Sequence, residues 1–194
     1  MRLARACQQA FTVLAFTMAC TLLSAPMTGG AAAEDLPISR IAFIDVQGVL
    51  RAAEASRTIR DQIEAQRAKY QEEISGQERE LRAAEQELTE QRALLSPEAF
   101  QQRRQLFEQR VVEVQRGVQS KKRQLDEAYT QAMEQVRIAL VEIVADIAKE
   151  RKATAVLSKS VIVLAEKGID ISEESLKRLN QRLTAVSVKL PPIQ

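Results

Sequence analysis

Few residues of this chain could perform chemistry. Its cysteines are Cys7 and Cys20, both in an amino-terminal segment that we expect to be removed, and the chain contains no histidine. The remaining chain therefore lacks an imidazole base, a thiolate nucleophile and the usual ligands of a zinc site. Its carboxylates lie among arginines on expected helix faces, where solvated ion pairs are the ordinary arrangement. The sequence predicts no enzyme and no catalytic, cofactor-binding or metal-binding residue.

Two basic clusters could instead bind anionic partners. One contains Arg103 and Arg104, and the other contains Lys121, Lys122 and Arg123. The first pair could contact an anionic protein or a membrane surface. Basic residues on a solvated helix face also keep such a helix soluble, and this alternative stays open.

The first 33 residues have the features of a cleaved targeting segment. Arg2 and Arg5 give a positive start, residues 10–23 form an apolar stretch too short to span a bilayer, and residues 31–33 are small. We expect cleavage after Ala33 and export of the rest. Subtracting Arg2 and Arg5 from the 28 basic residues leaves 26, which equals the 26 acidic residues. This balance argues against a nucleic-acid-binding protein.

Most of the exported chain, residues 56–149, has the pattern of two long helices. Apolar residues recur at steps of three and four, which is the seam of a coiled coil. They are Ile63, Tyr70, Ile74, Leu81, Ala84, Leu88 and Leu95 in the first helix, and Phe100, Phe107, Val111, Val114, Val118 and Leu125 in the second. Ser96, Pro97 and Glu98 interrupt the pattern with a helix-capping hydroxyl, a proline suited to a first turn and a carboxylate.

The register of the two segments predicts an antiparallel hairpin. The pairs Ile74 with Val118 and Leu81 with Val111 are both centred on position 96, where the helix-stop residues lie. We therefore place the hairpin tip near residues 95–97. Gly76 and Gly117 fall at nearly the same level on opposite helices, and are either tolerated surface glycines or a paired weak point where the hairpin bends.

Short elements are expected on both sides of the hairpin, over residues 34–55 and 150–194. They are a buried strand at 41–44, a helix at 47–53 capped by Asp45, strands at 153–157 and 161–164, a helix capped by Ser172, and a final edge strand over 186–190. The predicted fold class is α+β: a small β-rich body with a long protruding antiparallel coiled-coil hairpin. Because so small a sheet is marginal alone, we expect an oligomer whose strands join into a shared barrel.

The order of these segments resembles the Skp/OmpH family. The resemblance rests on the start at 41–46, the long hairpin, the apolar segments 155–157 and 161–164, and the segment 169–172 before a helix. It implies an ATP-independent periplasmic holdase chaperone that binds unfolded outer-membrane β-barrel proteins. It also implies a homotrimer with three helical arms around a client cavity, and no cofactor.

The resemblance further suggests lipopolysaccharide as a partner of Lys121, Lys122 and Arg123, against the alternative of a solvated helix face. Arg103 and Arg104 could then contact anionic clients. The rival function is a structural or adaptor coiled coil that bridges fixed partners in the envelope. Capture of many unfolded proteins would distinguish a holdase from an adaptor with one stoichiometric partner.

Overall fold

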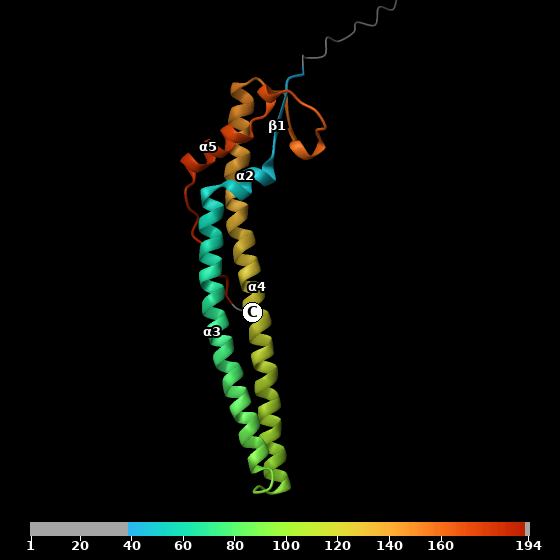
Figure 1. Cartoon of the computed structure of the whole chain (residues 1–194), viewed down its shortest axis with the longest axis vertical. Coiled ribbons are helices and arrows are strands. Elements are labelled where there is room, and N and C mark those ends of the chain that lie inside the picture. The colour runs from blue at the N-terminus through green and yellow to red at the C-terminus, as the bar shows by residue number, and fades with distance from the viewer. Residues whose placement is uncertain (1–38, 193–194) are drawn as a thin grey trace, which may run out of the picture. The chain divides into compact units, whose positions relative to one another are not determined.

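A long helical hairpin dominates the computed structural model, which describes residues 39–192 (Figure 1). Its helices are α3 (Glu54–Gln91) and α4 (Pro97–Glu150), with 38 and 54 residues. At 1.5 Å per residue they extend about 57 and 81 Å. The predicted α+β class, a small body with a long protruding antiparallel hairpin, is confirmed, but within the described residues the body has one two-stranded sheet, and the shared barrel stays a prediction. The predicted cleaved segment, residues 1–33, lies outside the described residues and stays a prediction.

Contacts across the hairpin have the predicted register. Arg110 donates to Glu80 at 2.6 Å, and Lys121 donates to Glu73. The midpoints of these pairs fall at positions 95 and 97, so the two helices face each other as the seam indicated.

The tip forms where the sequence changes from helix to capping residues. Helix α3 ends at Gln91, and a turn leads to Ser96, whose hydroxyl accepts a hydrogen bond from the Ala99 amide at 3.3 Å. Pro97 occupies the first turn of α4, where its missing N–H leaves no helical bond unmade. The predicted cap at Ser96 is confirmed.

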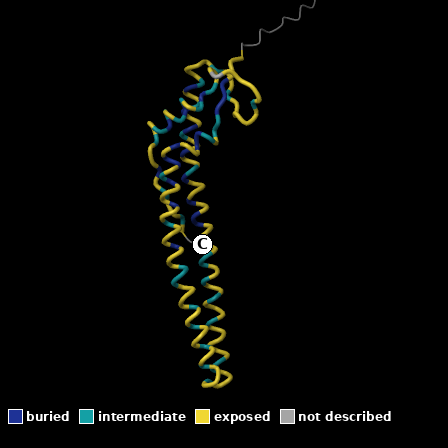
Figure 2. Tube along the Cα trace, in the orientation of Figure 1, coloured by how far each residue is buried: buried dark blue, intermediate teal, exposed yellow. Residues whose placement is uncertain are grey.

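Burial falls steeply along the hairpin from its root to its tip (Figure 2). The buried apolar residues of the hairpin are Ala55, Ile59, Ile63 and Tyr70 on α3, and Leu125, Ala128, Ala132, Val136, Leu140, Ile143 and Ile147 on α4. Between residues 71 and 123 no residue is fully buried, and the seam side chains are partly exposed. The root of the hairpin, residues 54–70 of α3 and 124–150 of α4, therefore holds a packed core. The distal part, residues 71–123, is a thin two-helix seam.

A two-stranded parallel sheet lies beside the root. Strand β1 (Ile41–Ile44) pairs in register with β2 (Ala155–Ser158), and Phe43 also forms a bridge to Asp170. Three of the four β1 residues are buried, as predicted for this apolar run. Strand β1 thus has a neighbour on each side. Within residues 39–192, β2 is paired only along its β1 edge.

The predicted strand at 161–164 is wrong. A 3-10 helix covers Lys159–Val161, and the next residues are irregular, with Val163 and Leu164 almost fully exposed. A strand needs a partner along its edge, and residues 39–192 supply none for this segment. Its apolar composition alone could not reveal that.

A short helix, α2 (Val46–Ala52), connects β1 to the hairpin. The Asp45 carboxylate accepts a hydrogen bond from the Gly48 amide at 2.8 Å, which confirms the predicted cap. A Cβ at Gly48 would lie 2.4 Å from an Asp45 carboxylate oxygen, so any side chain there would displace the capping carboxylate. The chain then breaks at Ala53, whose extended backbone separates α2 from α3.

Helix α5 (Ser172–Arg182) packs on α2 and α4, but its predicted cap is wrong. Ser172 is the first helical residue, and its hydroxyl accepts a hydrogen bond from the Asp45 amide at 2.8 Å. The Asp170 carboxylate instead accepts from the Ser172 amide at 2.9 Å. The acceptor for this amide at the start of α5 is therefore Asp170, two residues before Ser172, and not the Ser172 hydroxyl. Helix α5 also caps α3, because the Asn180 side-chain oxygen accepts a hydrogen bond from the Glu54 amide at 3.0 Å.

The predicted edge strand over 186–190 is also wrong. Residues after α5 run in extended form beside α3 and finish against α4, as the trace to the C label in Figure 1 shows. They bond to glutamine side chains of the hairpin rather than to another strand. Within the described residues, no helix is long and apolar enough to cross a membrane.

Candidate functional site on the hairpin and its root

The first basic pair lies near the hairpin tip and is engaged in ion pairs. Arg103 donates to Glu87 at 3.5 Å and to Gln91, both on α3. Arg104 donates to Glu108 at 2.9 Å, one turn along its own helix. Both side chains remain about half exposed, so these pairs are solvated and weak.

The second basic cluster is divided between two environments. Lys121 has only 15% of its side chain exposed, bonds Glu73 and lies 5.2 Å from the centre of the Tyr70 ring. This position suits a cation–π contact that fastens α4 to α3. Lys122 is exposed, and Arg123 is exposed with a bond to Ser120 at 2.9 Å. The cluster therefore offers two outward charges rather than three.

The two clusters do not form one site. Arg104 and Lys122 are 18 residues apart on one helix, which corresponds to about 27 Å. A groove of about 340 Å³ lies between the helices beside the second cluster, and Tyr70, Lys121 and Lys122 are among its lining residues. Its polar and apolar lining suits weak contact with many partners rather than one rigid ligand.

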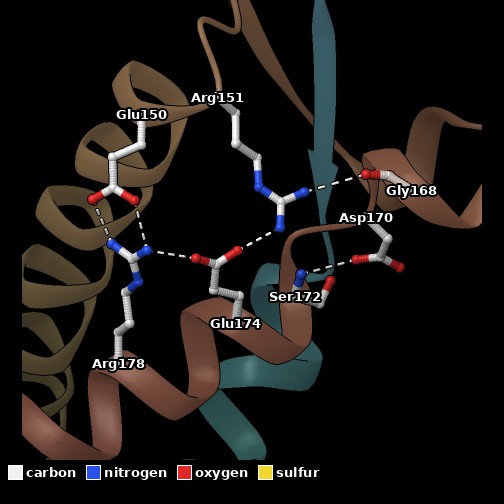
Figure 3. A network of polar contacts seen from close by, with 7 residues as sticks. All are labelled: Glu150, Arg151, Gly168, Asp170, Ser172, Glu174 and Arg178. Atoms are coloured by element: carbon white, nitrogen blue, oxygen red, sulfur yellow. Dashed lines mark hydrogen bonds and ion pairs between the residues drawn. The ribbon is translucent and has the colours of Figure 1, made fainter.

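A network of charged residues fastens α5 to the end of α4 (Figure 3). Arg178 bonds both carboxylate oxygens of Glu150, at 2.7 and 2.8 Å, and also bonds Glu174. Arg151 bonds the other Glu174 oxygen and the Gly168 carbonyl, the latter at 3.2 Å. Two guanidinium groups therefore hold three segments of the root together.

These contacts shift the pKa of both acids. The hydrogen bond from Arg178 lowers the pKa of Glu150, with further help from the charges of Arg178 and Arg151. The hydrogen bonds from Arg151 and Arg178 lower the pKa of Glu174. The bond to Glu150, followed by the bond to Glu174, raises the pKa of Arg178. The lowered pKa of Glu150 and Glu174 and the raised pKa of Arg178 keep these three groups ionised at neutral pH, so the arrangement is a structural clasp rather than an acid–base site.

Asp170 belongs to the same end of the body. Partial burial tends to raise the pKa of Asp170, but hydrogen bonds from Ser172 and Lys159 outweigh it, and the pKa is lowered. Lys159 lies 3.3 Å from the Asp170 carboxylate. The ionised Asp170 thus stabilises the start of α5.

An apolar segment beside the sheet lacks cover. Val161, Val163 and Leu164 are at least 70% exposed, and the segment borders a hollow of about 480 Å³ that Phe43 also lines. Exposed aliphatic side chains gathered next to an open strand edge are typical of a surface that another chain covers.

The basic residues were found from the sequence, but three glutamine and asparagine contacts were missed. Gln62, Gln124 and Asn180 bond to backbone groups of distant segments. Amides at these positions fit a solvated helix face equally well, so only the fold could identify their partners.

A small mixed body that carries a long two-helix hairpin defines the class of the protein. The family described as outer membrane protein (OmpH-like) matches residues 40–179. The chain belongs to the OmpH-like family.

Among solved structures, one match is the crystal structure of an OmpH-like protein from Caulobacter crescentus CB15, assigned provisionally as an outer membrane chaperone. The two chains share 13% sequence identity, the match covers 81% of this chain and 93% of that one, and the TM-score is 0.74. This likeness establishes the shared fold. No curated protein sequence gives a significant match.

Proposed function

We propose that the protein is an ATP-independent holdase chaperone of the periplasm. It keeps unfolded outer-membrane β-barrel proteins in solution on their way to the outer membrane. The observation that carries this proposal is the gradient of burial along the hairpin, from a packed root to a thin distal seam. Unfolded barrel strands expose apolar faces and unpaired edges that aggregate in water. A deformable arm with mixed polar and apolar surface contacts such chains weakly and releases them without nucleotide.

The working unit is proposed to be a homotrimer. The open edge of β2 and the exposed Val163 and Leu164 support strand sharing between copies, since pairing would cover both. The number three comes from the resemblance to the Skp/OmpH family. Native mass spectrometry of the processed chain is expected to give a trimer, which Val163→Asp dissociates. Val112→Asp, which adds the same charge on the distal part of α4, is the control and should leave the trimer intact.

A light-scattering assay tests the chaperone activity. A urea-denatured outer-membrane barrel protein is diluted into buffer without nucleotide, with and without a stoichiometric amount of trimer. Suppression of aggregation for several unrelated barrel proteins supports the holdase. Capture of a single envelope partner at fixed stoichiometry, with no suppression, would instead establish the adaptor function.

The basic clusters are proposed to serve different partners. Lys122 and Arg123, supported by the paired Lys121, contact the phosphates of lipopolysaccharide, whereas Arg103 and Arg104 contact anionic clients. Reversing the charge of Lys122 and Arg123 should weaken binding to lipopolysaccharide micelles, and reversing Arg103 and Arg104 should not. Equal lipopolysaccharide binding by both double variants would assign Lys122 and Arg123 to an ordinary solvated helix face.

A further inference from the structure

The extended segment after α5, residues 183–192, is the C-terminal tail, and it packs against both helices of the hairpin root. Val186 is 5% exposed and belongs to the same apolar core as Ile59 and Ile63, while Leu183 and Val188 pack against that core. The intervening Ser187 and Lys189 are exposed. Over residues 186–189 the tail thus presents alternate side chains to the hairpin, as a strand with one buried face does, whereas Leu183 lies outside this alternation and Leu190 is 39% exposed.

Glutamine side chains hold the tail by its backbone. The Gln62 amide donates to the Val186 carbonyl at 2.8 Å and accepts from the Val188 amide at 3.0 Å. Bonding the carbonyl and amide on either side of one residue is what a residue of a neighbouring parallel strand does. Gln62 therefore takes the place of a neighbouring strand, and both of its hydrogen bonds to the tail are with backbone groups rather than with a side chain.

A second contact holds the far end of the tail. The Gln124 amide donates to the Pro191 carbonyl, and the Gln124 carbonyl oxygen accepts from the Tyr70 hydroxyl. From Gln62 to the level of Tyr70 is about 12 Å along α3, and four extended residues from Ser187 to Pro191 span about 13 Å. These lengths are comparable, so an extended tail reaches from Gln62 on α3 to Gln124 on α4.

The geometry points to a peptide-binding groove that the chain occupies with its own tail. Backbone-reading amides and pockets for alternate apolar side chains are the two elements of strand-type peptide recognition. We propose that the groove accepts extended client segments with alternating apolar residues and that the tail competes with them. The inference deepens the proposed holdase function, because strands of an unfolded β-barrel have this alternation.

The strength of competition follows from tethering. A tethered segment acts at an effective concentration of about 1 mM. If the free tail peptide binds with a dissociation constant of about 0.1 mM, the tail weakens binding of any competitor by about tenfold. The tail therefore prevents binding of segments that make one weak contact. A long client that binds at several sites at once can still displace it.

A matched pair of variants tests the groove. Val186→Asp places a charge on the buried face of the tail and should release it, while Ser187→Asp adds the same charge to the exposed face one residue away. The probe is a fluorescein-labelled peptide with the sequence of residues 184–192, and its Val186→Asp, Val188→Asp form is the control peptide. By fluorescence anisotropy, the Val186→Asp chain should bind the probe about tenfold more tightly than the Ser187→Asp chain. Adding Gln62→Met to Val186→Asp should abolish the gain.

Equal weak binding by the two variants would overturn the groove. Circular dichroism establishes that each variant is folded, and if Val186→Asp is not, the chain ended after Thr184 takes its place in the same comparison. Aggregation assays separate this inference from the proposed function. Suppression by the parent chain without any gain in client affinity from Val186→Asp refutes competition alone, whereas probe binding without suppression by any chain refutes the holdase and leaves the groove.

Discussion

Replacing Leu140 by alanine tests whether the root holds most of the folding free energy. Leu140 is 1% exposed in the core of the root, and the next residue, Val141, is 63% exposed. Removing a buried leucine side chain costs its transfer free energy and leaves a cavity, so we expect Leu140→Ala to destabilise the protein by about 3 kcal/mol. Val141→Ala is the control, with an expected loss below about 0.5 kcal/mol.

The distal seam supplies the contrasting variant. Leu81 is half-buried between the helices, where neighbouring side chains can close a gap, so Leu81→Ala is expected to cost about 1 kcal/mol. Urea unfolding followed by circular dichroism, at one fixed protein concentration, gives all three values. A loss for Leu81→Ala equal to that for Leu140→Ala would refute the gradient of stability along the hairpin. Hydrogen exchange should agree, with amides of residues 71–123 exchanging faster than those of the root.

Two further predictions concern the clasp and the glycines. Because the lowered pKa of Glu150 and Glu174 favours their ionised forms, their contribution is complete above the ordinary value of 4.5 and is lost as the pH falls through the lowered one. The urea concentration at the unfolding midpoint should therefore decrease when the pH is lowered below about 4, and Arg178→Met should reduce that decrease. An unchanged pH dependence in this variant would contradict the clasp. Replacing Gly76 and Gly117 by alanine should stabilise the arm by up to about 1 kcal/mol each, because neither added Cβ meets an atom closer than 3.9 Å. The distribution of spin-label distances across the arm should then become narrower. An unchanged distribution would show that the glycines are not a weak point.

The hairpin could be predicted because its information is local and repeated. Seam residues at steps of three and four set the helix faces, the centring of Ile74 with Val118 set the register, and Ser96 marked the tip. Each observation restricted the same structure independently.

The body was harder to predict because the segments that contact one another in it are distant in the sequence. Apolar residues at 161–164 have strand composition, but a strand forms only with a neighbour along its edge. The error at Ser172 has a different cause, since two side chains competed for one helix start and Asp170 is the acceptor. The sequence indicated an extended segment over 186–190 but not its partner, because Gln62 has the same sequence signature on a solvated face as in a backbone contact.

The contacts at the root connect stability with adaptability. Asn180 caps α3, Arg178 holds the end of α4, and Ser172 binds the end of β1, so α5 ties together every element from which the arm projects. Bending the arm beyond residue 70 leaves each of these contacts intact. It disturbs only half-buried side chains, whose loss costs far less than opening a packed core. The arm can therefore bend while the body stays folded, which is the property that the proposed holdase function, without an energy source, requires.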